Sequence, residues 1–311
     1  MNKSQRLREL IAAPEILVMP GLFDGFSARL TQAVGFAAGF LTGSGISEAG
    51  LGWADRGVMG MEENLRVCRA LVACCDLPLI ADADTGYGNA VNVHFTIRAF
   101  EQAGVSGVMI EDQTWPKRCG HMKGKEVVSA EEGAEKIRAA AEARRTPELV
   151  IMSRTDALAT HGLKEVIRRL QMYAEAGADL LFADALLSRE HMRTVVGNVP
   201  GPVCVNMGFG IRQRETTALL SPQELQDLGV RAAIYPRLLT AAAIQGMKNA
   251  LAVLRESMRT GAVIERPDLV VSFEELNALV GVEELNRLER RYLLPHQYRA
   301  RYESATHEAV T

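Results

Sequence analysis

The segment Glu-Ala-Gly-Ala-Asp-Leu-Leu-Phe-Ala-Asp-Ala (175–185) contains the unit from which the fold is built. Gly177 follows a helix-like stretch, where a glycine commonly ends the last helical turn in the left-handed conformation. The run Leu180–Ala183 is continuously apolar, which is typical of a strand buried on both faces. Asp184 then closes the run with a carboxylate. The segment therefore predicts a helix, a tight turn, a buried strand and a polar strand end, in that order.

The same unit recurs along the 311 residues. Similar turns stand at Gly35, Gly104 and Gly229. About eight β–α units in one chain predict a (β/α)₈ barrel of the TIM type. The alternative is an open doubly wound sheet, which would more often show a GxGxxG turn after its first strand, and the sequence has none there. The expected strands are Ile16–Met19, Ala38–Thr42, Leu77–Ala81, Gly107–Ile110, Leu149–Met152, Leu180–Ala183, Val203–Val205 and Ala232–Tyr235.

Amphipathic stretches between these runs predict helices. Ser129 and Ser221 are each followed three residues later by a glutamate, which is a capping signature. From about residue 240 we expect helices alone, so the chain is predicted to be one barrel domain (1–311) with a C-terminal helical extension over 241–311. The clearest helical stretches are Val91–Ala103, Ala130–Ala143, Leu163–Ala176, Pro222–Leu228, Ala241–Arg259, Phe273–Val280 and Glu283–Leu293.

Composition narrows the class of protein. The formal net charge is −3 and the chain has no basic block, which argues against nucleic acid as a partner. No apolar run approaches the roughly 20 residues that span a bilayer, and the first ten residues lack the apolar core of a signal peptide. The five cysteines form no CxxC pair and no disulfide pattern. We therefore expect a cytoplasmic protein that acts on a small molecule.

Polar residues close nearly every predicted strand at the same end. In a barrel, chemistry gathers where strands end and the following loops begin. One polar residue there is commonly a helix cap, but six positions in register are hard to explain by capping alone. They are Thr42-Gly43-Ser44, Asp82-Ala83-Asp84, Glu111-Asp112, Arg154-Thr155-Asp156, Asp184 and Asn206.

Asp82 and Asp84 are the sharpest pair in this set. Residues two apart on a strand point the same way, so both carboxylates can aim at one place. Mg²⁺ prefers hard oxygen ligands and keeps several waters. Asp82, Asp84 and Glu111, with Asp55 from the loop after the second strand, could form such a site. The alternative is that Asp84 only caps a turn.

The segment Lys117-Arg118-Cys119-Gly120-His121 places a thiol among three potential cations. Neighbouring cations favour the thiolate form of a cysteine. The segment lies in a connection from about Asp112 to Val128, and connections of that length are often lids over active sites. Two alternatives remain open at this point: Cys119 and His121 could hold zinc, or the segment could be a solvated basic loop.

These motifs together resemble the isocitrate lyase/phosphoenolpyruvate mutase superfamily, over almost the whole chain. The motifs are Asp82-Ala-Asp84-Thr-Gly-Tyr-Gly, Ile110-Glu111-Asp112-Gln113, Lys117-Arg118-Cys119-Gly120-His121, Arg154-Thr155-Asp156-Ala157 and Val205-Asn206-Met207. The resemblance implies a Mg²⁺-dependent barrel, with Mn²⁺ as an alternative ion, and a homotetramer in which a C-terminal helix swaps between subunits.

The resemblance also implies roles for single residues. Asp82 would ligate Mg²⁺, and Asp55, Asp84 and Glu111 would hold it through waters. Thr42, Gly43 and Ser44 would bind the keto-acid half of the substrate, and Arg154 a carboxylate or the 2-oxygen. Asp184 and Asn206 would complete the substrate pocket.

The cysteine-bearing loop separates branches of the superfamily, and Cys119 favours a carbon–carbon lyase. Cys119 would be the general acid, while Lys117, Arg118 and His121 would stabilise the charge of the leaving group. A carboxyphosphonoenolpyruvate-type mutase and an oxaloacetate hydrolase or decarboxylase are the alternatives on the same scaffold. A non-catalytic metabolite-binding homologue is less favoured, because the polar motif residues are all present.

Three departures from the lyase pattern bear on the substrate. Asp184 stands where the lyases carry a glutamate. Phe209 stands close to a position where a glutamate is frequent in the family, and Ala241 stands where 2-methylisocitrate lyases carry an arginine. An unpaired buried carboxylate is costly, so the missing arginine argues against a second carboxylate on the leaving group. A 2,3-dimethylmalate-like substrate is therefore expected ahead of 2-methylisocitrate, unless Arg237, Arg212 or Arg214 replaces that arginine.

Overall fold

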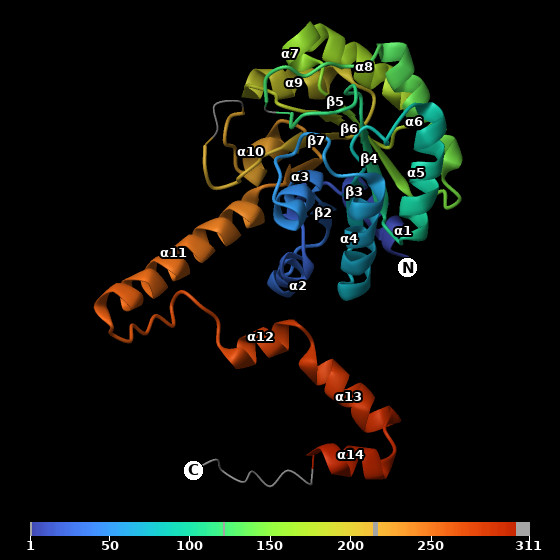
Figure 1. The fold of residues 1–311 in the computed structure, drawn as a ribbon. Helices are drawn as coiled ribbons and strands as arrows, with labels where there is room; N and C mark the ends of the chain where they lie inside the picture. Colours follow the sequence, from blue (N-terminus) through green and yellow to red (C-terminus); the bar gives the residue numbers. More distant parts are fainter. Residues whose placement is uncertain (1, 121, 214–216, 303–311) are drawn as a thin grey trace. The chain divides into compact units, whose positions relative to one another are not determined.

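A computed structural model describes residues 2–120, 122–213 and 217–302, and it contains a closed parallel barrel of eight strands in the order β1 to β8 (Figure 1). The pairing of β8 with β1 closes the barrel, with Leu17 opposite Ala232. The predicted (β/α)₈ architecture is confirmed. The strands are β1 (Leu17–Leu22), β2 (Gly39–Leu41), β3 (Leu79–Asp82), β4 (Gly107–Glu111), β5 (Val150–Thr155), β6 (Leu180–Ala183), β7 (Val203–Asn206) and β8 (Ala232–Tyr235).

The strands are buried on both sides, which explains their unbroken apolar sequence. One cluster of buried side chains fills the barrel interior, including Met19, Phe40, Met152 and Phe182. Leu7 of the first helix belongs to the same cluster. A second, larger cluster joins the outer faces of the strands to the surrounding helices. This rigid double-layered core fixes the strand ends on which the site is built.

Helices follow the strands as the sequence predicts, and their ends show the expected chemistry. Gly35, Gly104, Gly177 and Gly229 have φ values of +94°, +88°, +107° and +84°, as left-handed helix stops require. Ser129 accepts a hydrogen bond from the Glu132 amide at 3.1 Å. The helices of this part are α1 (Lys3–Ala12), α2 (Gly25–Val34), α3 (Gly43–Ile46), the π-helix η1 (Ser47–Leu51), α4 (Met61–Cys74), α5 (Ala90–Gln102), α6 (Ala130–Ala143), α7 (Leu158–His161), α8 (Leu163–Glu175), α9 (Arg189–Asn198) and α10 (Pro222–Asp227).

The chain divides into two compact units, Met1–Gln245 and Gly246–Thr311. Helix α11 (Leu238–Thr260) begins in the first unit and ends in the second. The second unit continues with α12 (Phe273–Leu279), α13 (Val282–Tyr292) and α14 (Pro295–Tyr302). None of the helices in the described ranges is long and apolar enough to span a membrane. The predicted exchange of a C-terminal helix between subunits stays a prediction.

Candidate active site

A polar pocket opens at the carboxyl ends of the barrel strands, where the sequence predicts the site. Eight of the predicted site residues line it: Thr42, Ser44, Asp55, Asp82, Cys119, Arg154, Asp184 and Asn206. The other lining residues are Phe40, Gly120, Ile234, Pro236 and Arg237. Gly43 packs closely against this site, since a Cβ at this position would lie only 3.0 Å from Asp82 Oδ2.

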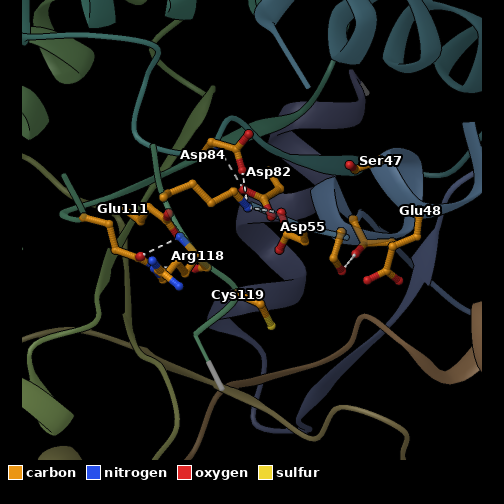
Figure 2. Close-up of polar contacts among 12 residues, drawn as sticks. Ser47, Glu48, Asp55, Asp82, Asp84, Glu111, Arg118 and Cys119 are labelled. Carbon is orange, nitrogen blue, oxygen red and sulfur yellow. Dashed lines mark hydrogen bonds and ion pairs between the residues drawn. The ribbon is translucent and has the colours of Figure 1, made fainter. Parts of the chain in front are cut away.

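The predicted carboxylates gather beside this pocket, and Figure 2 shows Asp55, Asp82 and Asp84 close together. The expectation that Asp82 and Asp84 share a strand is wrong, since β3 ends at Asp82. Asp84 lies in the following turn with φ +49°, and its amide donates to Asp82 Oδ1 at 3.0 Å. A tight turn, and not strand alternation, therefore brings the second carboxylate to the site.

Lys117 is buried within this carboxylate cluster. Its Nζ contacts Asp55 Oδ1 and lies 2.6 Å from Asp84 Oδ1, and its side chain is only 3% exposed. Burial alone would lower the pKa of Lys117, but Asp84 and Asp55 raise it well above its ordinary value. The alternative of a solvated basic loop is therefore wrong for Lys117.

The pKa values of the carboxyl groups are raised, because the nearby cations do not fully offset the effect of burial. Burial raises the pKa of Asp82, and raises that of Asp84 to about 7, against the opposing effect of Lys117. Burial also raises the pKa of Glu111 well above its usual range. Glu111 Oε2 lies 3.2 Å from Arg154 Nη1, yet neither of its carboxylate oxygens has a hydrogen-bond partner among the described residues.

This donor set fits a hard divalent cation, because it consists of buried carboxylates with unused acceptor capacity. Within the described ranges, no three Asp, Glu, His or Cys side chains stand in an arrangement that could by itself hold a metal ion. The Lys117 ammonium stands between Asp55 and Asp84, and water would have to supply much of the remaining shell, as is usual for Mg²⁺.

Arg154 is the second buried cation, and it contacts three carboxylates of the protein. Its Nε and Nη2 donate to Asp156 at 2.8 and 3.1 Å, and Nη2 also donates to Asp184 Oδ2 at 2.9 Å. Burial alone would raise the pKa of Asp156, but Arg154 and Lys125 hold it below its usual range. Asn206 donates to Asp184 Oδ1 at 3.1 Å, so the residues predicted for the substrate pocket form one network.

The cysteine-bearing loop packs directly against this network. The Cys119 amide donates to the Asp55 carbonyl at 3.1 Å, and Gln113 exchanges two hydrogen bonds with the Arg118 backbone at 2.8 and 3.0 Å. A Cβ on Gly120 would lie 1.7 Å from Asp184 Oδ2, so only glycine permits this approach. His121 lies outside the described residues, and its predicted role stays a prediction.

Three charged residues at the site were not predicted as site residues: Glu48, Lys125 and Arg237. Of these, Arg237 was considered only as a replacement for the arginine that is missing at Ala241. Arg237 Nη2 donates to Cys119 Sγ at 3.6 Å, and Arg237 Nη1 donates to Glu48 Oε1 and Oε2 at 2.6 and 2.7 Å. Lys125 Nζ lies 3.0 Å from Asp156 Oδ1. No sequence motif marked them, although Arg237 stands two residues after the end of the predicted eighth strand. Phe209 and Ala241, which the sequence ties to the substrate, are not among the lining residues.

Comparison with known proteins agrees with this geometry. Residues 7–255 match the family model described as phosphoenolpyruvate phosphomutase. The chain is 40% identical to a 2,3-dimethylmalate lyase of Eubacterium barkeri, over 94% of this chain and 99% of that protein. It is 36% identical to a chloroplastic carboxyvinyl-carboxyphosphonate phosphorylmutase of Arabidopsis thaliana (92% and 84%) and 37% identical to a 2-methylisocitrate lyase of Bacillus subtilis (81% and 81%).

Solved structures give the same result. An oxaloacetate acetylhydrolase in complex with 3,3-difluorooxalacetate superposes with a TM-score of 0.86 at 30% identity, covering 93% of this chain and 96% of that one. A 2,3-dimethylmalate lyase gives 0.85 at 31% identity (94% and 95%). A phosphonopyruvate hydrolase complex with oxalate and Mg²⁺ gives 0.83 at 30% identity (94% and 100%).

The barrel, with a polar pocket and a buried acidic cluster at the carboxyl ends of its strands, defines an enzyme that acts on small molecules. The chain belongs to the phosphoenolpyruvate phosphomutase family, within the isocitrate lyase/phosphoenolpyruvate mutase superfamily. The predicted resemblance is thereby confirmed.

Proposed function

We propose that this chain is a Mg²⁺-dependent carbon–carbon lyase that cleaves a small substituted 2-hydroxy dicarboxylate into pyruvate and a carboxylic acid. The observation that carries the proposal is Cys119, which lines the same pocket as Asp82 and Arg154. A positioned proton donor is what a carbanionic leaving group needs. The relatives named as 2,3-dimethylmalate and 2-methylisocitrate lyases support this choice of reaction.

The binding step uses groups on four strand ends. Thr42 Oγ1 and Ser44 Oγ, 3.0 Å apart, would hold the keto-acid half together with the Gly43 backbone. Arg154 would orient a carboxylate or the 2-oxygen. Asp82 would hold Mg²⁺ directly, with Asp55, Asp84 and Glu111 behind water. When bound, the ion would supply Lewis-acid polarisation at the substrate oxygens.

The cleavage step needs a proton at carbon and positive charge nearby. The 2-hydroxyl passes its proton to Asp55, a carboxylate that lines the pocket. The C2–C3 bond then breaks, the C–O bond becomes the keto group of pyruvate, and the electron pair of the broken bond passes to C3 of the leaving acid. Cys119 then donates the proton that C3 takes up. Lys117 and Arg118 stabilise the charge that develops on the leaving carboxylate, as fixed cations do in a site closed to water.

The charges of the pocket favour a substrate with two carboxylates over one with three. Lys117, Arg154 and Arg237 each already contact carboxylates of the protein. Every substrate carboxylate must therefore compete with a protein carboxylate for these cations. Each additional one adds buried negative charge that they do not fully neutralise, which is costly. We propose a 2,3-dimethylmalate-like substrate first, with 2-methylisocitrate second.

A phosphonomutase or an oxaloacetate hydrolase remains the competing proposal, because relatives and structural neighbours carry those names. The deciding experiment is proton NMR of the chain with Mg²⁺ and, separately, 2,3-dimethylmalate, 2-methylisocitrate, isocitrate and oxaloacetate. Pyruvate with propionate would support the lyase and the dicarboxylate preference. Oxalate with acetate from oxaloacetate would replace the lyase by a hydrolase.

The role of Cys119 is tested with C119S and the matched control C74S, since Cys74 lies on α4 and does not line the pocket. We expect C119S to lose turnover while it still binds oxalate in the presence of Mg²⁺. Normal pyruvate release by C119S would exclude Cys119 as the proton donor.

A further inference from the structure

Glu48 is a carboxylate that the proposed mechanism does not use, although it stands directly behind the pocket wall. It belongs to η1, and Figure 2 shows it next to Ser47, on the opposite side of the acidic cluster from Glu111. Both of its carboxylate oxygens accept from Arg237 Nη1, at 2.6 and 2.7 Å. The other terminal nitrogen of Arg237 donates to Cys119 Sγ at 3.6 Å. Arg237 therefore joins Glu48 to the proposed proton donor.

The backbone of Arg237 is held on both sides. The Arg237 amide donates to the Gly208 carbonyl at 3.2 Å, and the Ala241 amide donates to the Arg237 carbonyl at 3.1 Å as α11 begins. The side chains of Arg237 and Glu48 are 19% and 28% exposed, so solvent only partly screens their charges. Burial alone would lower the pKa of Arg237, but Cys119 and Glu48 raise it.

Among the ion pairs of the described residues, Arg237 contacts one carboxylate, that of Glu48. Arg154 contacts Glu111, Asp156 and Asp184, and Lys117 contacts two aspartates. Loss of the Glu48 charge would therefore leave Arg237 without a carboxylate partner among these ion pairs, whereas Arg154 and Lys117 would each keep another one. The leaving acid must lie on this side of the pocket, because it takes its proton from Cys119.

We propose that Glu48 determines substrate specificity: by neutralising Arg237, it selects leaving acids with one carboxylate and rejects those with two. This inference rests on the proposed lyase function. A second carboxylate near Arg237 would lie beside the Glu48 carboxylate, and like charges in one wall act as a repulsive element against the wrong ligand. With Glu48 neutral, the same guanidinium becomes a carboxylate receptor.

The test compares E48Q with the control E62Q, because Glu62 is an exposed glutamate on α4. The readout is the ratio of kcat/KM for 2-methylisocitrate to that for 2,3-dimethylmalate. We expect E48Q to raise this ratio at least about tenfold, the size expected from losing one like charge at short range. The double variant E48Q/R237M should lose the gain, since the receptor is then gone. An unchanged ratio in E48Q would overturn the proposal.

A second measurement separates this inference from the lyase proposal. The affinities of succinate and propionate are measured by calorimetry, with Mg²⁺ and oxalate present, for wild type, E48Q and E48A. We expect both variants to gain affinity for succinate relative to propionate. If wild type cleaves neither substrate, the lyase proposal fails, and a gain in succinate binding would still support Glu48 as the discriminating charge. Equal relative affinities in all three proteins would refute it.

Discussion

Lys125 holds the cysteine-bearing loop against the pocket, and its removal should open that loop. The ammonium donates to the Gly120 carbonyl at 2.5 Å and to Asp156 Oδ1 at 3.0 Å, and the side chain is 3% exposed. Asp156 in turn holds Arg154 through two hydrogen bonds. Lys125 thus connects the residue after Cys119 with the arginine proposed to orient the substrate.

The size of the effect follows from these contacts. A hydrogen bond to a charged group contributes about 1.5–3 kcal/mol. The variant K125M keeps the length of the side chain but loses both bonds, while Arg154 still neutralises Asp156. We therefore expect the closed loop to lose about 2–3 kcal/mol relative to the open loop, which is roughly a 30- to 150-fold change in their ratio.

The assay is the rate at which iodoacetamide labels Cys119, followed by mass spectrometry in a C74S background. K125M should label faster than wild type by a factor in that range, and its kcat should fall. The control is K123M, because Lys123 lies exposed in the same loop. Equal labelling rates and equal kcat values in K125M and K123M would refute a latch at Lys125.

Three further changes test the site. D82N should weaken Mg²⁺ binding by more than the roughly 10- to 100-fold that is typical of losing an outer-shell partner. The exposed control D76N should leave Mg²⁺ affinity unchanged, and calorimetry would measure both. The raised pKa of Asp84, about 7, means that protons compete with the metal below that pH, so Mg²⁺ affinity should rise between pH 5.5 and 7.5 and then level off; a flat profile would contradict this competition. In the metal-free protein, this carboxyl group binds its proton more tightly in the folded state than in the unfolded state. Its contribution to the free energy of unfolding should therefore fall as pH rises from about 4 to 7, and the melting temperature should fall with it. G120A should lower kcat strongly with little change in melting temperature, because its methyl group would overlap Asp184; an unaltered kcat would mean that the loop does not close in this way.

Most of the site could be predicted because its residues follow strand ends. Thr42, Asp82, Arg154, Asp184 and Asn206 all stand where an apolar run stops, and the barrel brings such positions to one face. The position of Asp84 could not be predicted in this way, because a residue with φ +49° lies in a turn that strand periodicity does not describe. The loop around Cys119 was recognised as a site element, but not which of its cations would be buried.

The barrel, the end of it that carries chemistry, and the residue types gathered there can all be read from the amino-acid pattern. It could do so because burial of each strand and helix leaves a local, periodic pattern of apolar residues. The partner of each charge, by contrast, depends on the folded chain: Lys117 pairs with Asp55 and Asp84, Lys125 with Asp156, and Glu48 with Arg237 across 189 residues of chain. Such pairs depend on how irregular loops fold over the barrel mouth, and an ion pair between distant segments leaves no periodic trace in the sequence.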